Sequence, residues 1–370
     1  MLFDVNPKER KEDLYDRERE LNEIFDALKR KERLIVIVGM RRAGKSSVLR
    51  VSLKEAEMPH AILDVKGIYF EKGVISRQDI YTNIASYFSA NLKFFERIGF
   101  NVRDLAKRIK GFRVMSSGID IEPTANFSLR DLLERIDAWC ERNGTRFVLA
   151  FDEAQYLRYG GGVRYNGIIA WCVDNLSNIT IILTGSEVGM LNNFLKIEDQ
   201  ESPLFGRYLR EVFIDRFTRE QSIEFLRLGF KELGIKIDIR EIEEAVDMLD
   251  GVAGWLTYYG YYHGVRGLSH TNALNEVYRT AVRLVIGELE RIIAPSRRRY
   301  AAILKAIAQG ISSWSDIKRY VVTVAGNIND ARFDELLEKL MKYGYVEKRD
   351  NKYMIPDLVV RKVISEGLKL

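Results

Sequence analysis

The sequence has 370 residues, a length typical of two or three domains. Hydrophobic residues make up 46% of the chain and charged residues 30%, which is the balance of a globular protein that buries a sizeable core. No apolar run approaches the roughly 20 residues that span a bilayer, and the charged beginning of the chain has no signal-peptide pattern. We therefore expect a cytoplasmic protein with no membrane partner.

The basic excess of the chain is concentrated in its last fifth. Residues 297–370 contain 15 Lys and Arg against 9 Asp and Glu, a net charge of +6, while the remaining residues carry a net charge of −1. A basic terminal module is typical of proteins that bind nucleic acid or another acidic partner, and it is equally compatible with solubility alone. The expected partner of residues 297–370 is therefore DNA or an unknown protein.

Cysteine and histidine show no metal-binding spacing. Cys140 and Cys172 are the two cysteines, and both stand in apolar segments, which indicates buried free thiols. His60, His263 and His270 show no metal or triad pattern, so we expect them to be structural or surface residues.

The first predicted elements are a helix and two strands. The apolar spacing within residues 13–30 predicts an amphipathic helix after a turn. Residues 34–38 form an apolar, β-branched run that is typical of a buried parallel strand, and residues 60–65 have the pattern of the next strand.

Helices and strands then alternate along the chain. Residues 77–110 have helical periodicity, residues 111–123 alternate around Ser-Gly and predict a short hairpin insertion, and Ser128 is placed to cap another helix. Residues 146–151 and 179–183 predict two more buried strands. This alternation predicts an α/β fold, with a parallel sheet covered by helices on both faces.

The pattern changes after about residue 216. Thr218 begins a capping box, and helical periodicity continues to about residue 293, which predicts a helical lid subdomain. The tyrosine-rich residues 258–262 indicate helix packing within it rather than a base-stacking platform.

The end of the chain has the pattern of a winged helix. Residues 294–296 have the composition of a linker. Three helical stretches follow, then Gly344 as a helix C-cap and a predicted hairpin. The predicted domains are residues 1–216, 217–293 and 297–370.

A glycine-rich loop follows the first strand. Residues 39–46 match G-x-x-x-x-G-K-[ST], the phosphate-binding P-loop. In such a loop, backbone N–H groups and a helix N-terminus surround phosphate oxygens. Lys45 would reach the β- and γ-phosphates and the Ser46 hydroxyl would ligate Mg²⁺. The alternative is a chance match on a surface loop, which the flanking strand argues against.

A second acidic element suits the same chemistry. Residues 147–151 are apolar and end in Asp152 and Glu153, the pattern of a Walker B strand. Asp152 would hold Mg²⁺, and Glu153 would activate the attacking water as a general base. Many buried strands end in acidic residues, so this pattern indicates a Walker B strand only because a P-loop precedes it in the chain.

Other polar side chains are candidates for the terminal phosphate. Thr184 or Ser186, at the end of a third strand, would sense it, although Thr-Gly-Ser is also a common turn. Arg207 in a Gly-Pro loop would stabilise transition-state charge, with a surface ion pair as the alternative. For Arg41 and Arg42 in the P-loop we expect outward-facing ion pairs.

Together these elements resemble the archaeal ATPase family, a branch of the AAA+/STAND P-loop NTPases. Residues 13–21 resemble the family's N-terminal box, residues 39–47 its P-loop and residues 152–155 its D-E-x-Q motif. Residues 184–186 resemble its sensor strand and residues 203–207 its P-L-Y-G-R loop. The resemblance covers nearly the whole chain and also implies a C-terminal winged helix.

The resemblance implies ATP or ADP with Mg²⁺ as cofactors. In the family, the N-terminal box and a lid motif help to form the adenine pocket. The lid motif corresponds to residues 250–256, where Asp250 replaces a glycine and Ala253 replaces the proline that lines the adenine pocket in the family. The residues placed at the nucleotide are Leu14, Tyr15, Arg17, Gly39, Arg42, Ala43, Gly44, Lys45, Ser46, Ser47 and Trp255.

Three functions fit these patterns. The first is a nucleotide-driven switch or slow ATPase, whose catalytic residues are Lys45, Glu153, Arg207 and Ser186. The second is a DNA-binding protein regulated by ATP, although acids on the expected recognition helix within residues 329–343 would repel phosphate. The third is a binding module with a degenerate nucleotide site, which the intact motifs argue against. A nucleotide-dependent oligomer is expected if Arg207 acts across a subunit interface.

Overall fold

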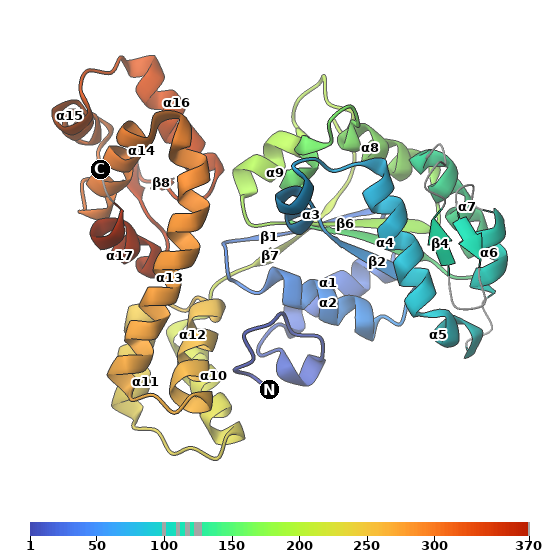
Figure 1. The fold of residues 1–370 in the computed structure, drawn as a ribbon, viewed down its shortest axis with the longest axis horizontal. Coiled ribbons are helices and arrows are strands. Elements are labelled where there is room, and N and C mark those ends of the chain that lie inside the picture. Colours follow the sequence, from blue (N-terminus) through green and yellow to red (C-terminus); the bar gives the residue numbers. More distant parts are fainter. Residues whose placement is uncertain (98–100, 109–111, 115–118, 122–127, 369–370) are drawn as a thin grey trace.

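The computed structural model describes residues 1–97, 101–108, 112–114, 119–121 and 128–368, and Figure 1 shows how their elements are arranged. An α/β part built on a sheet stands beside a narrower, mostly helical part, in which one long helix runs between two helical groups. Within the described residues, no helix combines the length and the apolar character needed to cross a lipid bilayer.

A parallel sheet forms the centre of the α/β part. Within the described residues it has five strands in the order β2-β5-β6-β1-β7, each parallel to its neighbours. The predicted α/β fold with a parallel sheet is confirmed. The strands are β1 (Leu34–Gly39), β2 (His60–Asp64), β5 (Phe147–Asp152), β6 (Ile179–Gly185) and β7 (Arg210–Ile214).

Strand β7 is the part of the sheet that the sequence pattern did not predict. Val212 and Ile214 are buried, whereas Glu211 and Phe213 are exposed. The strand lies at the edge of the sheet and pairs with β1 alone. It therefore lacks the continuous apolar run of a strand that is buried on both faces.

Helices cover both faces of the sheet (Figure 1). On one face, α1 (Glu18–Lys29) and α2 (Lys45–Glu55) pack against Ile35 and Ile37 of β1, while the alternate residue Val36 belongs to the opposite hydrophobic layer. The remaining elements of this part are η1 (Lys11–Asp13), α3 (Val65–Lys72), α4 (Arg77–Ala90), α5 (Leu92–Arg97), α6 (Val102–Arg108), β3 (Phe112–Val114), β4 (Ile119–Ile121), α7 (Leu129–Arg142), η2 (Ala154–Tyr159), α8 (Tyr165–Asn175) and α9 (Val188–Leu195).

Three local predictions in this part are confirmed. Strands β3 and β4 pair antiparallel as the expected hairpin, whose residues 115–118 lie outside the described residues. The Ser128 side chain accepts a hydrogen bond from the Asp131 N–H and so caps α7. Cys140 and Cys172 are free and buried, also as expected.

The helical part begins with the predicted capping box. The Thr218 side chain accepts from the Gln221 N–H, and the Gln221 side chain accepts from the Thr218 N–H. Its elements are α10 (Arg219–Glu232), α11 (Ile239–Leu249), α12 (Ala253–Gly260), the π-helix η3 (Tyr261–Val265), α13 (His270–Ile293), η4 (Ala294–Ser296), α14 (Arg297–Ala308), α15 (Trp314–Ala325), α16 (Asp330–Lys342), β8 (Glu347–Arg349), β9 (Lys352–Met354) and α17 (Leu358–Gly367).

The last of these elements form the expected winged helix. Gly344 ends α16 with a φ of 70°, and the Tyr345 N–H donates to the carbonyl of Leu340. Strands β8 and β9 pair antiparallel around Asp350 and Asn351, whose φ angles of 47° and 59° are those of a tight hairpin turn. Helix α17, which the sequence pattern did not predict, packs on α13 and α14.

The lid and the winged helix share one continuous hydrophobic cluster. Trp255 of α12, Val285 of α13, Ile303 of α14 and Val363 of α17 are all fully buried in it. Residues 294–296, predicted as a linker, instead form the short helix η4 between α13 and α14. The lid and the winged helix are therefore packed as one unit across this junction.

Phe3 ties the beginning of the chain to this body. Its ring is fully buried and makes edge contacts with Phe225 (5.7 Å) and Phe230 (5.1 Å). A Cβ at Gly229 or Gly260 would lie 2.1 or 2.3 Å from the ring, so only glycine fits at these two places. The segment that follows Phe3 is thereby fixed to the lid.

We expect Phe3→Ala to lower the free energy of unfolding by about 3 kcal/mol, because it empties a ring-sized space that the two helices cannot close. Denaturant unfolding measures the loss. Val5→Ala is the control, since Val5 is 41% exposed and its truncation should change stability by less than about 0.5 kcal/mol. Similar values for both variants would contradict an anchoring role for Phe3.

Candidate nucleotide site

The P-loop joins β1 to α2, as its sequence predicts. Gly39 has a φ of 156°, and a Cβ there would lie 2.2 Å from the carbonyl oxygen of Ile214 on β7. Gly44 adopts a φ of 105° as the N-cap of α2, so both glycines occupy conformations that other residues rarely adopt. The first N–H groups of α2 thus face the loop, where a phosphate is favoured.

Lys45, the first residue of α2, is buried and folded back onto the loop. Its Nζ donates to the carbonyl oxygens of Gly39 (3.1 Å) and Met40 (2.7 Å). Burial lowers the pKa of Lys45 to about 8, although the negative charge of Glu153 opposes the shift. The ammonium group is therefore charged at neutral pH, but it loses its proton more readily than a lysine in water does.

Asp152 lies at the end of β5 beside Thr184 at the end of β6. The Thr184 hydroxyl donates to Asp152 Oδ1 and accepts from the N–H of Glu153 at 3.0 Å. Burial raises the pKa of Asp152, and hydrogen bonds from Thr184 and Ser46 oppose the shift. Thr184 thus connects the two acidic residues through its hydroxyl.

Glu153 is held in a strained conformation with a φ of 57°. Its Oε2 accepts from the Ser186 hydroxyl at 2.7 Å and from the Gln155 amide at 2.5 Å. Burial alone would raise the pKa of Glu153, but the charge of Lys45 and these hydrogen bonds lower it overall. The carboxylate is therefore ionised, as a general base must be.

A cavity of about 280 Å³ lies between the P-loop, the N-terminal segment and the lid. Gly39, Asp152, Ser186, Arg207 and Trp255 are predicted site residues that do not line it. The predicted residues that line it are Leu14, Tyr15, Arg17, Arg42, Ala43, Gly44, Lys45, Ser46, Ser47 and Glu153.

Gly39 and Ser186 border a second cleft. This cleft, of about 820 Å³, lies on the other side of the P-loop, towards the winged helix. Arg41 of the P-loop and Tyr345 of the winged helix both line this cleft, and the Arg41 guanidinium packs on the Tyr345 ring. The P-loop is therefore placed between the nucleotide cavity and the winged helix.

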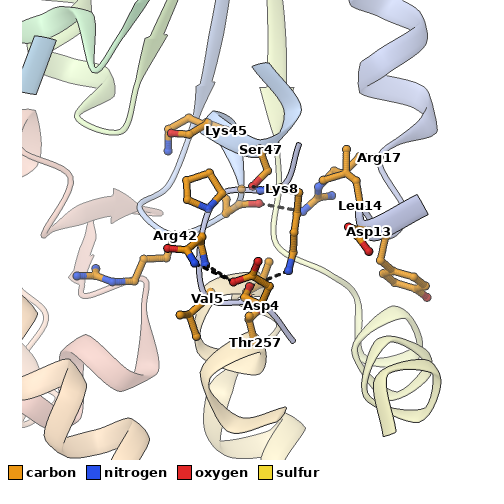
Figure 2. Close-up of a pocket in the computed structure, with 18 of the residues that line it drawn as sticks. Asp4, Val5, Lys8, Asp13, Leu14, Arg17, Arg42, Lys45, Ser47 and Thr257 are labelled. Carbon is orange, nitrogen blue, oxygen red and sulfur yellow. Dashed lines mark hydrogen bonds between the residues drawn. The ribbon is translucent and has the colours of Figure 1, made fainter. Parts of the chain in front are cut away.

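The segment of residues 4–8 lines the cavity and was missed by sequence reasoning. Figure 2 shows it between Ser47 and Thr257 of the lid. The Lys8 N–H donates to the Ser47 hydroxyl at 3.0 Å, and Lys8 Nζ donates to the carbonyl of Asp4 at 2.7 Å. No sequence motif marks these residues, because contacts with distant parts of the chain, among them the Phe3 anchor and the bond to Ser47, hold them at the site.

An aromatic wall closes another side of the cavity. The Tyr15 ring meets Phe217 at 5.4 Å and Phe225 at 5.6 Å. Arg17 stacks over Phe217 at 4.5 Å, and its Nη2 donates to the carbonyl of Ala43 in the P-loop at 3.2 Å. Arg17 therefore supports the loop from behind as well as lining the cavity.

Comparison with known proteins identifies the family. Residues 14–258 match the model of an ATPase domain predominantly from Archaea, and residues 295–355 match the C-terminal winged helix-turn-helix domain of MCM proteins. The Walker-type ATPase of Pyrococcus abyssi is 38% identical and superposes with a TM-score of 0.88, over 98% of this chain and 99% of that one. The chain belongs to this archaeal ATPase family. No curated protein matches the sequence.

More distant structures share the fold of this archaeal ATPase-family chain. The ORC2 protein of Aeropyrum pernix in ADPNP-ADP complexes is 14% identical, with a TM-score of 0.60 over 98% of this chain and 97% of that one. Its ADP form is 12% identical, with a TM-score of 0.53 over 100% and 98%. At these identities the likeness concerns the fold alone.

Trp255, a predicted nucleotide contact, lies outside the lining of the cavity. Its ring is fully buried, with the Arg42 guanidinium 4.5 Å above it. Its indole nitrogen donates to Asp357 Oδ2 at 2.9 Å. The indole therefore lies behind Arg42 and joins the lid to α17.

Arg207 also lies away from the cavity. Its guanidinium donates to both carboxylate oxygens of Asp174, at 2.8 and 2.6 Å. This is the surface ion pair that the sequence left open as the alternative, so the structure does not bring Arg207 to the P-loop of its own chain.

The expectation that Arg41 faces outward is wrong. Its guanidinium donates to Glu187 (2.9 Å) and to the carbonyl of Tyr343 (2.5 Å), and its Nε lies 3.3 Å from Glu288. The Tyr345 ring packs on it at 4.4 Å. These partners come from the start of α9, the lid helix α13 and the winged helix, which no local sequence pattern brings together.

We expect Trp255→Phe to lower the free energy of unfolding by about 2 kcal/mol, because the buried Asp357 loses its indole donor. Trp314→Phe is the matched control, since its indole donates to the exposed Asp334 and its loss should cost about 1 kcal/mol or less. Denaturant unfolding compares the variants. Equal costs would contradict a buried structural role for the Trp255 indole.

Proposed function

We propose that the protein is a Mg²⁺-dependent, slow ATPase of the AAA+/STAND type that couples its nucleotide state to the winged helix. The observation that carries this proposal is the ionised, hydrogen-bonded Glu153 beside Lys45 and Asp152. A site built only to bind nucleotide does not need a half-buried carboxylate held in this way. The proposed domains are residues 1–216, 217–293 and 297–370.

The cavity suits an adenine nucleotide. The aromatic wall of Tyr15, Phe217 and Phe225 offers apolar surface to a purine, and the P-loop offers N–H groups to the phosphates. Lys45 would turn from the loop carbonyls to the β- and γ-phosphates. ATP and ADP are the proposed cofactors.

The oxygen donors near the P-loop fit Mg²⁺. Ser46 and Asp152 share a hydrogen bond, so a hydroxyl and a carboxylate already converge, which is the donor set that Mg²⁺ prefers. These two residues would hold the ion. When bound, Mg²⁺ would neutralise charge on the phosphate oxygens.

Glu153 would accept the proton of the attacking water, with Ser186 and Gln155 fixing its orientation. Arg207 is proposed to act only across a subunit interface, since Asp174 holds it outside the cavity of its own chain. Such a role requires an oligomer that forms with ATP.

DNA binding by residues 297–370 is the second candidate, favoured by their net charge of +6. The expected recognition helix argues against it in this arrangement. On α16, Arg332 pairs with Glu335 and Lys342 with Glu338. A winged helix that docks on protein is therefore the favoured proposal.

We expect Glu153→Gln to slow ATP hydrolysis by at least about 100-fold while ATP still binds, because the amide cannot accept the proton. Single-turnover hydrolysis and calorimetric binding separate the two effects. Glu141→Gln, an exposed change on α7, should hydrolyse at the wild-type rate. A Glu153→Gln protein as active as the wild type would exclude Glu153 as the base.

We also expect ATP affinity to fall as the pH rises through about 8. Below this pH Lys45 is charged and affinity is flat; above it, binding must first protonate the lysine, so affinity falls by up to about tenfold per pH unit. Titration calorimetry between about pH 7.5 and about pH 9.5 measures this. Lys45→Arg stays charged and should show little pH dependence. Parallel profiles for the two proteins would argue against the lowered pKa.

A further inference from the structure

Glu288 lies on α13, the helix that joins the lid to the winged helix. Among the described residues, three basic side chains meet its carboxylate: Lys66 Nζ at 3.0 Å, Arg41 Nε at 3.3 Å and Arg42 Nη2 at 4.0 Å. The Tyr345 hydroxyl donates to the same carboxylate at 3.3 Å. One lid carboxylate thus connects the P-loop, α3 and the winged helix.

The carboxylate of Glu288 is firmly ionised. Burial alone would raise the pKa of Glu288, but Arg41, Lys66 and Arg42 lower it to about 2. Its side chain is only 25% exposed, so water screens these attractions weakly. Arg41 also pairs with Glu187, so the three cations face two carboxylates, which leaves positive charge that another anion can share.

The cluster around Glu288 borders the nucleotide cavity. Leu284, one helical turn earlier on α13, lines that cavity, and so does Arg42. The charge of Lys66 also acts on Glu153, the proposed general base. The three cations are therefore within electrostatic reach of a γ-phosphate.

We propose that Glu288 is a positioning residue that sets the preference of the site for ATP over ADP. The inference rests on the proposed function, because it requires a nucleotide whose γ-phosphate lies beside Glu153. Glu288 and the γ-phosphate are both anions and compete for Arg41, Arg42 and Lys66. ATP draws cations from Glu288, whereas ADP lacks the competing phosphate and leaves them in place.

The same competition controls the attachment of the winged helix. Arg41 holds the carbonyl of Tyr343 and packs on the Tyr345 ring, so a shift of its guanidinium loosens both contacts. Nearby, Gly189 of α9 lies against the backbone of Lys342, where a Cβ would be 2.6 Å from the Lys342 Cα. ATP is therefore expected to weaken the docking of α16 on the α/β part.

The first experiment compares ATP and ADP affinity in full-length Glu288→Gln and Glu290→Gln proteins by titration calorimetry with Mg²⁺. Glutamine keeps the size of the side chain and removes its charge. Glu290 is the matched control, because it lies on the same helix and pairs with Arg297 at the surface. We expect Glu288→Gln to bind ATP about fivefold to tenfold more tightly and ADP within about twofold of wild type, with Glu290→Gln unchanged.

The second experiment follows amide hydrogen exchange in residues 336–349. ATP should accelerate exchange there in the wild type and ADP should not, whereas Glu288→Gln should exchange fast without nucleotide. Tyr345→Phe removes only the hydroxyl that donates to Glu288, and it should also accelerate exchange without nucleotide. This second variant tests the inference if Glu288→Gln fails to fold.

The outcomes separate this inference from the proposed function. Equal changes in ATP and ADP affinity in Glu288→Gln would overturn the role of Glu288. So would a rate of amide exchange in residues 336–349 that ATP does not change. Either result would leave the ATPase proposal intact. A wild-type protein that binds neither nucleotide would overturn both.

Discussion

The buried guanidinium of Arg41 is the constraint on which the arrangement of this molecule depends. A buried charge is tolerated only when its hydrogen-bond donors are paired, and loss of one partner costs several kcal/mol. Arg41 meets this requirement with Glu187, Glu288 and the carbonyl of Tyr343, each from a different part of the chain. The P-loop therefore cannot change shape without a response from the lid and the winged helix.

The sheet explains why the catalytic candidates meet. Strands β5, β6 and β1 are neighbours and parallel, so their carboxyl ends place Asp152, Thr184 and Gly39 along one edge. Thr184 then fixes the two acids relative to each other through its single hydroxyl. The P-loop and the acidic motif, far apart in sequence, become one site through strand order alone.

Local sequence patterns predicted the elements that are determined by residues close together in the chain. The inner strands, the P-loop, the caps of Ser128 and Thr218 and the hairpin after Gly344 all follow from runs, spacings and turn residues that the sequence displays. The features that the sequence patterns did not predict depend on contacts between residues far apart in the chain. Edge strand β7 has a mixed pattern. Residues 4–8 are held at the cavity by the insertion of Phe3 into the lid and by the bond from Lys8 to Ser47, and the inward turn of Arg41 requires acids that lie over 140 residues away.

The adjacent Arg42 gives the P-loop a second connection to the winged helix. Its guanidinium lies on the Trp255 ring, and its carbonyl accepts from the N–H of Gly254 at 2.9 Å, so the lid holds both its side chain and its backbone. Trp255 in turn donates to Asp357, whose carboxylate also accepts from the first N–H groups of α17. Arg41 reaches the winged helix through α16 and Arg42 reaches it through α17. Because lid and winged helix share one core, a displacement of either arginine acts on the same body.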